Sequence, residues 1–272
     1  MANSVDTNDI IFTTAFKDIN RWNWVYYKKS NETYINLFCN LANNIKYKLI
    51  VYVENDIAEL IHKNPNNKFS DNTNIIFIDM KSVFTFHDKY LENDTNIINS
   101  SDYKNKIPYH RKENPEHLYS SYNLINHSKI NFVSNTKKLF PNYTYYSWID
   151  FGAMNTNIEN VPNDIDISLL QNNITYHCVK EPPHTRITEI EMLNSDEVYF
   201  LGSAFIVHTN LVEKFEELWE NKIIEWQEKN ITDDDQNLIL QLYYDYPDLF
   251  SKIKNTELFG MYRKLKRISY KN

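Results

Sequence analysis

The sequence predicts an α/β fold in which a largely parallel sheet is flanked by helices. Apolar, β-prone runs occur at Ile10–Phe16, Lys48–Val53 and Ile75–Ile78, and a segment with helical spacing separates the first two. Alternating strands and helices are typical of parallel sheets, because a crossover helix returns the chain to the same edge. The 272 residues, 42% of them hydrophobic, show no internal repeat and no linker rich in Pro, Gly or Ser. We therefore expect one continuous domain over residues 1–272.

The helices of the first half are predicted from capping residues and apolar spacing. Ser30 can cap a helix in which five residues follow at helical spacing: Tyr34, Leu37, Phe38, Leu41 and Ile45. Residues 92–114 are polar, so we expect a long surface excursion there. From Pro115 to Leu139 apolar residues again recur at helical spacing, and the pattern predicts a helix with one interruption.

The second half continues the alternation of strands and helices. Three further β-prone runs are expected to be strands: Tyr143–Ile149, Ile174–Val179 and Val198–Val207. Asn210 and Glu213 have the spacing of a capping box at a helix start. Thr232 is placed to cap another helix, which should end near Pro247.

Charge and composition argue against several classes of protein. The formal net charge is −7, which opposes nucleic acid as a partner, because phosphate binding needs a basic surface. The basic residues within 263–271 are better explained by a solvated terminal helix or tail than by a nucleic-acid patch. No apolar run approaches a transmembrane segment, the first eight residues lack signal-peptide features, and the two cysteines lack CxxC spacing. We expect a cytoplasmic protein.

Asp150 is the first candidate for chemistry. It follows directly after a predicted strand and precedes Phe151 and Gly152. The carboxyl ends of parallel strands are where α/β proteins bind ligands. Beside a bound diphosphate, this carboxylate could hold Mg²⁺ or Mn²⁺ through oxygen. The alternative, which is simpler when Asp150 is considered alone, is an Asp that only forms a turn with Gly152.

The run Asp233-Asp234-Asp235-Gln236 also has two interpretations. Acidic residues in the first turn of a helix complement its dipole. That role needs at most two carboxylates, and Gln236 adds an amide beside them, so Asp235 is a second candidate. Four cations could contact a phosphate, although each alone is better explained as a surface charge: Arg21, Arg111, Lys129 and Arg186. No Gly-rich phosphate loop, GxSxG elbow or HExxH motif occurs.

Four stretches extend these candidates over nearly the whole chain: Thr14-Ala15-Phe16-Lys17-Asp18-Ile19-Asn20-Arg21, then Asn114-Pro115-Glu116 with Tyr122-Asn123 and Ser128-Lys129, then Trp148-Ile149-Asp150-Phe151-Gly152, and finally Asp233-Asp234-Asp235-Gln236 with Pro247-Asp248-Leu249-Phe250. In order and spacing they resemble the HtrL/YibB family of glycosyltransferase-like proteins. The chain departs from the family at Asn20, where Gly is usual, and in the loops 55–74 and 92–112. Its abundant Asn, Ile, Lys and Tyr have AT-rich codons, which suggests an AT-rich bacterial or giant-virus genome.

The resemblance implies a GT-A (Rossmann-like) fold, in which a nucleotide-sugar-binding half (1–152) and an acceptor-binding half (153–272) share one sheet. It implies transfer of a sugar from a nucleotide-sugar donor, a UDP-sugar above all, to a glycan, lipid-linked or protein acceptor. In the usual GT-A pattern an Asp-x-Asp binds the metal that bridges the donor's diphosphate, so Asp150 is the expected ligand of Mn²⁺ or Mg²⁺. Gly152 replaces the second Asp, and we expect the ion to be recruited mainly by the diphosphate.

The resemblance and the chemistry of transfer suggest roles for the other candidates. The leaving diphosphate gains negative charge, which Lys129 and, second, Arg21 would offset. Three residues at the end of the first strand would cradle the nucleoside: Thr13, Ala15 and Phe16. Asp235, paired with Gln236, would face the anomeric centre or the acceptor hydroxyl. Two alternatives stay open: a non-catalytic GT-A-like protein that binds a nucleotide or sugar, and a nucleotidyltransferase.

Overall fold

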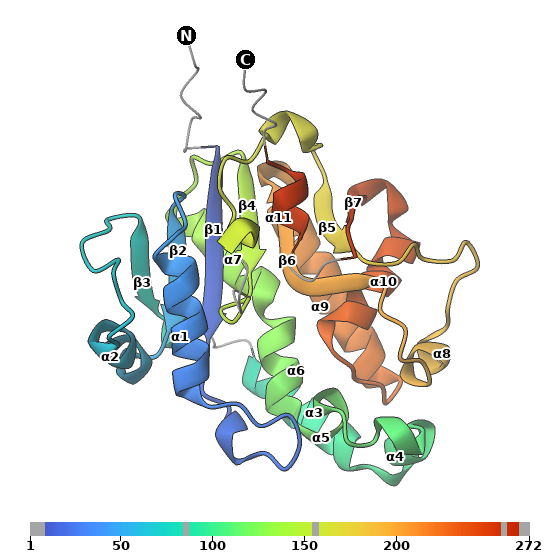
Figure 1. Cartoon of the computed structure of the whole chain (residues 1–272). Coiled ribbons are helices and arrows are strands. Elements are labelled where there is room, and N and C mark those ends of the chain that lie inside the picture. Colours follow the sequence, from blue (N-terminus) through green and yellow to red (C-terminus); the bar gives the residue numbers. More distant parts are fainter. Residues whose placement is uncertain (1–8, 84–86, 154–157, 257–259, 267–272) are drawn as a thin grey trace.

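The computed structural model describes residues 9–83, 87–153, 158–256 and 260–266, and its centre is one seven-stranded sheet (Figure 1). The strand order is β3-β2-β1-β4-β6-β5-β7. The strands are β1 (Ile10–Phe16), β2 (Leu49–Val53), β3 (Ile75–Asp79), β4 (Tyr145–Ile149), β5 (Ile174–Cys178), β6 (Phe200–His208) and β7 (Phe250–Lys254). Among them only β6 runs against the rest, because its pairings with β4 and β5 are antiparallel and the others are parallel. The expected α/β class with a mainly parallel sheet is confirmed.

Helices cover both faces of the sheet, and each face has its own apolar cluster (Figure 1). One face is covered by α1 (Asn31–Ala42), α2 (Asn55–Lys63) and α11 (Met261–Lys264). The other is covered chiefly by α3 (His87–Asn99), α7 (Lys129–Leu139), α9 (Val212–Glu228) and α10 (Asp235–Asp245). Residues of β1 and β2 alternate between the two clusters, since successive side chains of a strand point to opposite faces. Burial on both faces explains why these strands are continuous apolar runs in the sequence.

Most predicted elements are confirmed, with small shifts at their ends. β1 has the predicted bounds, and all five other predicted strands are present, as β2 to β6. α1 begins after Ser30, whose hydroxyl accepts the N–H of Thr33 at 3.2 Å. The helical pattern from Pro115 is interrupted twice, at Tyr119 and Ser128, and not once. It forms three helices: α5 (Pro115–Leu118), α6 (Ser120–His127) and α7.

The surface excursion predicted for residues 92–114 is wrong. This stretch holds much of α3 and all of α4 (Ser101–Lys106), which Ser100 caps by accepting the N–H of Tyr103 at 3.2 Å. Three side chains anchor the two helices in the core: Ile97, Ile98 and Tyr103. Because only a narrow stripe of each helix is buried, the apolar residues are too sparse to give a clear periodicity.

Two predicted helix starts are also wrong. α9 begins at Val212 without a side-chain cap, and Glu213, expected to form a capping box with Asn210, pairs with Lys137 at 2.6 Å. α10 is capped by Asp234, whose carboxylate accepts the N–H of Gln236 at 2.9 Å, and not by Thr232. The Asp234 carboxylate satisfies the helix start directly, which leaves no such role for the Thr232 hydroxyl.

The C-terminal basic residues are described only as far as Lys266, and residues 267–271 lie outside the described part of the chain. Arg263 and Lys264 belong to α11, where Lys264 is exposed. None of the described helices combines the length and the apolarity needed to cross a lipid bilayer.

Candidate active site

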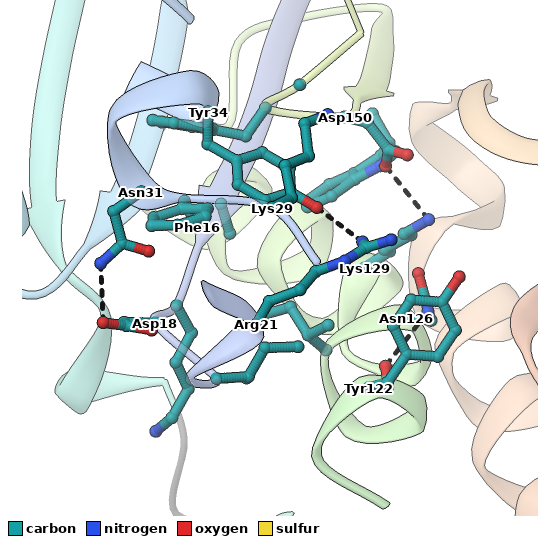
Figure 2. A pocket seen from close by; sticks show the side chains of 17 residues that line it. Phe16, Asp18, Arg21, Lys29, Asn31, Tyr34, Tyr122, Asn126, Lys129 and Asp150 are labelled. Carbon is teal, nitrogen blue, oxygen red and sulfur yellow. Dashed lines mark hydrogen bonds and ion pairs between the residues drawn. The ribbon is translucent and has the colours of Figure 1, made fainter. Parts of the chain in front are cut away.

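A cavity of about 250 Å³ opens at the carboxyl ends of β1 and β4, and we call it the strand-end cavity (Figure 2). The two strands are parallel neighbours, with Ile10 opposite Tyr145, so their last residues meet at one edge of the sheet. Phe16 and Asp150 both line this cavity, which confirms that the two strand ends form one pocket. Further walls come from the loop after β1 and from α1, α6 and the start of α7. This is the usual position of a ligand site in an α/β sheet.

Aromatic rings hold the turn that follows β4. Phe151 stacks between Phe16 and Phe38, with ring centroids 4.9 and 4.4 Å away. Gly152 lies against Tyr34, and a Cβ at this glycine would be only 3.0 Å from the Tyr34 ring. A side chain at position 152 would therefore require Tyr34 to move. Close packing at this turn therefore disfavours a residue larger than glycine.

Lys129, the first residue of α7, connects the two predicted carboxylates. Its Nζ lies 2.6 Å from Oδ2 of Asp235, 3.0 Å from the carbonyl oxygen of Gly202 and 3.1 Å from Oδ1 of Asp150. These three acceptors use the three hydrogens of the ammonium group. Burial lowers the pKa of Lys129, but the two carboxylates outweigh burial and raise it above its usual value. Lys129 is therefore a fixed positive charge between Asp150 and Asp235.

Asp235 lies behind Lys129 and is almost completely buried, with 3% of its surface exposed. Its carboxylate is pressed against Gly202 of β6, where a Cβ would come within 1.9 Å of Oδ2. Burial raises the pKa of Asp235, and the ion pair with Lys129 opposes that rise. The structure thus brings Asp150, Lys129 and Asp235 together, with Asp235 beneath the floor of the strand-end cavity.

Asp150 is more accessible, with 35% of its side chain exposed toward the cavity. Its Oδ1 accepts from Lys129 and, at 2.7 Å, from Nε1 of Trp148. Among the described residues, Oδ2 has no such donor, and Gly152 supplies no second carboxylate. The described residues therefore offer one free carboxylate oxygen at this position, whereas Mg²⁺ takes about six oxygen ligands. These residues fit an ion only if diphosphate and water oxygens complete its coordination.

The rest of the acidic run has different surroundings. Burial raises the pKa of Asp233, and the Glu116 carboxylate raises it further. Burial and the carboxylates on either side raise the pKa of Asp234, the cap of α10. Gln236 and Asp234 line a neighbouring hollow of about 280 Å³, which we call the second cavity. The two cavities share walls formed by Arg21 and Tyr122.

Three cations between β1 and α1 line the strand-end cavity, Lys17, Arg21 and Lys29, and the contacts of Arg21 and Lys29 involve Tyr34 (Figure 2). Arg21 donates through Nη1 to the Tyr34 hydroxyl at 2.6 Å and through Nε to the carbonyl oxygen of Tyr27 at 2.8 Å. Lys29 lies over the Tyr34 ring, with Nζ 4.3 Å from the ring centroid. Burial and the Arg21 charge lower the pKa of Lys29. The sequence prediction missed Lys29, although a lysine just before the Ser30 cap was a signal that could have found it.

The remaining predicted residues are divided between the cavity and its surroundings. Ala15 lines the strand-end cavity, whereas the Thr13 hydroxyl is buried and donates to Thr136 at 2.9 Å. Arg111 lines the second cavity and pairs with Glu116 at 3.1 Å. Arg186 pairs with Asp245 on the outside of α10 and lines neither cavity.

Comparison with known proteins gives a family but no activity. A family model described as "Bacterial protein of unknown function (HtrL_YibB)" matches residues 8–267. Protein HtrL of Escherichia coli (strain K12) is 24% identical over 253 residues, covering 88% of this chain and 85% of that protein. Two solved structures are similar at 12% identity and TM-scores of 0.42. They are 4-diphosphocytidyl-2C-methyl-D-erythritol synthase from Anaerococcus prevotii DSM 20548, with 94% of both chains covered, and an active-site mutant of LgtC, with 96% of this chain and 84% of that one covered.

Proposed function

This chain belongs to the HtrL/YibB family, as its sequence predicts, and we propose that it transfers a sugar from a nucleotide-sugar donor, a UDP-sugar, to an acceptor. One observation carries the proposal: the buried Lys129 ammonium joins Asp150 to Asp235 at a strand-end cavity whose opposite wall holds Arg21 and Lys29. A nucleoside diphosphate is the kind of ligand that such a charge distribution suits. It is anionic at one end and planar and partly apolar at the other.

The cations of the loop are the proposed ligands of the diphosphate. Lys129 has no hydrogen left for a phosphate while its three contacts persist. It acts by reducing the combined charge of the two carboxylates, so that an anion can approach Asp150. Arg21 and Lys29 line the cavity itself and would offset the charge that develops on the leaving diphosphate.

Asp150 is the proposed protein ligand of Mn²⁺ or Mg²⁺, together with the diphosphate. When bound, the ion supplies further positive charge to the leaving group. Because the part of the site that the structure describes offers one free carboxylate oxygen, we expect weak binding of the ion without nucleotide. Asp150 also keeps the Trp148 indole and the Lys129 ammonium in place, at 2.7 and 3.1 Å.

The two halves of the chain would divide the substrates. Ala15 and Phe16 of the half 1–152 would contact the nucleoside. Thr13 would support them indirectly, because its hydroxyl bonds β1 to Thr136 of α7. In the half 153–272, Gln236 would face the reacting sugar or the acceptor from the second cavity. Asp235 is then a positioning residue, which acts through Lys129. The acceptor would be a glycan, lipid-linked or protein group met in the cytoplasm.

A non-catalytic protein that binds a nucleotide or sugar is the second candidate. Gly152 favours it, because this residue leaves the turn without the second carboxylate of the usual metal motif. Such a protein would share the diphosphate site and differ only in turnover. The two candidates are separable by experiment.

The first experiment measures UDP binding to the full chain by calorimetry, with Mn²⁺ and with EDTA. Lys29→Ala and Arg21→Ala should each weaken binding at least tenfold, or about 1.4 kcal/mol. Lys46→Ala is the matched control, because Lys46 forms an exposed pair with Asp164 at 3.2 Å and lies outside both cavities. Absence of UDP binding, or equal effects of Lys29→Ala and Lys46→Ala, would refute the proposed diphosphate site.

The second experiment measures release of UDP from UDP-glucose, UDP-galactose and UDP-N-acetylglucosamine. Asp235→Asn should lower turnover by about 100-fold, the lower end of what a positioned catalytic group contributes, because Lys129 would lose its 2.6 Å carboxylate partner. The affinity of this variant for UDP should not fall, because the substitution removes a negative charge beside Lys129 and leaves the site more positive. UDP binding without turnover of any donor would favour the non-catalytic candidate. Release of pyrophosphate from UTP and a sugar phosphate would favour a nucleotidyltransferase.

A further inference from the structure

We propose that Glu116, His117 and Asp233 form a second site, which binds a divalent transition-metal ion such as Zn²⁺. This site is separate from the Asp150 position, and the evidence for it does not depend on the proposed transfer reaction. Glu116 and His117 belong to α5, and Asp233 lies just before α10. One ligand atom from each residue lies within 4.8 Å of the other two, and Nε2 of His117 is 3.8 Å from Oε1 of Glu116. An ion here would join α5 to the start of α10.

All three residues are removed from solvent. Their exposed fractions are 7% for Glu116, 5% for His117 and 1% for Asp233. Two carboxylates in such a place are costly unless a positive charge compensates for them. Arg111 supplies one, through Nη2 to Oε1 of Glu116 at 3.1 Å. No cation among the described residues pairs with Asp233.

The hydrogen bonds around His117 determine which ring nitrogen carries the proton. The Tyr103 hydroxyl has one hydrogen, which it donates to the carbonyl oxygen of Thr232 at 2.6 Å. The 2.7 Å contact between Tyr103 and Nδ1 of His117 must therefore use the hydrogen on Nδ1. Nε2 is then the unprotonated nitrogen, with a lone pair available for a ligand. A metal-binding histidine commonly donates its other ring N–H in this way.

The Nε2 lone pair has no partner in the described part of the chain. It is buried and lies 3.8 Å from Oε1 of Glu116, which is itself an acceptor, so the lone pair has no donor of its own. Each Asp233 oxygen accepts one hydrogen bond at 2.8 Å, Oδ1 from the N–H of Asp234 and Oδ2 from Nδ2 of Asn237, and each keeps a second lone pair. Both donors to Glu116, Arg111 and Asn114, reach Oε1 and not Oε2. One imidazole nitrogen and two carboxylates are a ligand set that Zn²⁺ accepts.

The position of the site gives the ion a structural role. Glu116 lines the second cavity together with Asp234 and Gln236, which follow directly after Asp233. An ion between α5 and Asp233 would therefore hold the wall from which Gln236 faces that cavity. Binding of the ion should stabilise the folded chain, because the three ligands come together only when it is folded.

The test uses the full chain, stripped with EDTA and then titrated with Co²⁺ and Zn²⁺. We expect one ion per chain, a Co²⁺ absorption spectrum indicating nitrogen coordination, and a rise in Tm. His117→Gln and Asp233→Asn should each weaken binding at least 100-fold. His177→Gln, at another buried histidine, is the matched control and should bind like the wild type. Asp150→Asn should also bind like the wild type, which separates this site from the donor site.

Several results would overturn the proposal. A stripped chain that takes up no stoichiometric Co²⁺ or Zn²⁺ would show that a proton or a water satisfies Nε2. Binding unchanged in His117→Gln would place the ion elsewhere. If His117→Gln fails to fold, the spectrum of the Co²⁺-loaded wild type still decides the matter, because a spectrum without nitrogen coordination contradicts the assignment.

Discussion

Replacement of Gly202 by Ala tests the contact between β6 and the buried ion pair without altering any charge. A Cβ at this position would lie 1.9 Å from Oδ2 of Asp235 and 2.2 Å from its Cγ. To reach ordinary van der Waals distance the carboxylate would have to retreat by roughly 1.5 Å in a closely packed interior. That movement would stretch the 2.6 Å contact between Asp235 and Lys129.

The expected cost follows from what is lost. A hydrogen bond to a charged group contributes about 1.5–3 kcal/mol, and breaking a buried ion pair costs about 3–5 kcal/mol. We expect Gly202→Ala to lower the free energy of unfolding by ~2–4 kcal/mol. No described glycine has positive φ, so the alanine adds no backbone strain of its own. In a chain that already carries Asp235→Ala, the same substitution should be close to neutral or stabilising by up to ~1 kcal/mol.

The assay is urea unfolding of four proteins: the wild type, Gly202→Ala, Asp235→Ala and the double variant. The double-mutant cycle isolates the energy that couples the two positions. We expect a coupling energy above ~1.5 kcal/mol. If Gly202→Ala costs the same in both backgrounds, the destabilisation comes from the strand itself, and the proposed collision is refuted.

Two further predictions concern the buried His177 and the aromatic contact of Trp24, which lies in the loop between β1 and α1. Burial lowers the pKa of His177, so the unfolded chain binds more protons at acid pH. Stability is then lost as pH falls, by up to about 1.9 kcal/mol between pH 7 and pH 5. His177→Gln should lack this part of the pH dependence of stability. If urea unfolding gives the two proteins parallel profiles of stability against pH, the prediction is contradicted. Trp24 stacks on Tyr119 at 3.9 Å and is 7% exposed, so Trp24→Ala should cost about 3–5 kcal/mol and weaken UDP binding. Trp22→Ala, at a side chain 48% exposed, should change stability by less than ~0.5 kcal/mol, and equal thermal shifts would count against an anchoring role for Trp24.

The strands were predictable where the sheet is buried on both faces. β1 and β2 are continuous apolar runs, because helices cover them from either side. β7 is an edge strand with partly exposed residues, and its segment Phe250–Lys254 has only two apolar residues and no regular alternation, so the sequence does not predict it. The helices within 92–114 were missed for a related reason, since each buries only a narrow stripe. β3 is also a partly exposed edge strand, and its apolar run Ile75–Ile78 was nevertheless sufficient to predict it.

The candidate site was predictable as a set of residues but not as an arrangement. Sequence and family resemblance selected Asp150, Lys129 and Asp235, and the structure brings them together. Their mutual contacts depend on chain segments up to 106 residues apart, which no local pattern encodes. The burial of Asp235 behind Lys129 follows from its packing on Gly202, a contact visible only in three dimensions. Lys29 lines the same cavity, and the one local signal for it was its position just before the Ser30 cap.

The position of β4 at the centre of the sheet affects how the chain acquires its fold during synthesis. β4 is hydrogen-bonded on one side to β1, with Ile10 opposite Tyr145, and on the other to β6. A nascent chain that ends at residue 152 therefore carries an unprotected strand edge, which invites association with other chains. The edge is covered only after Phe200–His208 has left the ribosome, and pairings this distant in sequence form slowly. Asp150 can meet Lys129 soon after β4 is made, but Asp235 reaches Lys129 only after a further 106 residues have been added, so the charge arrangement of the site is completed well after its first half has formed.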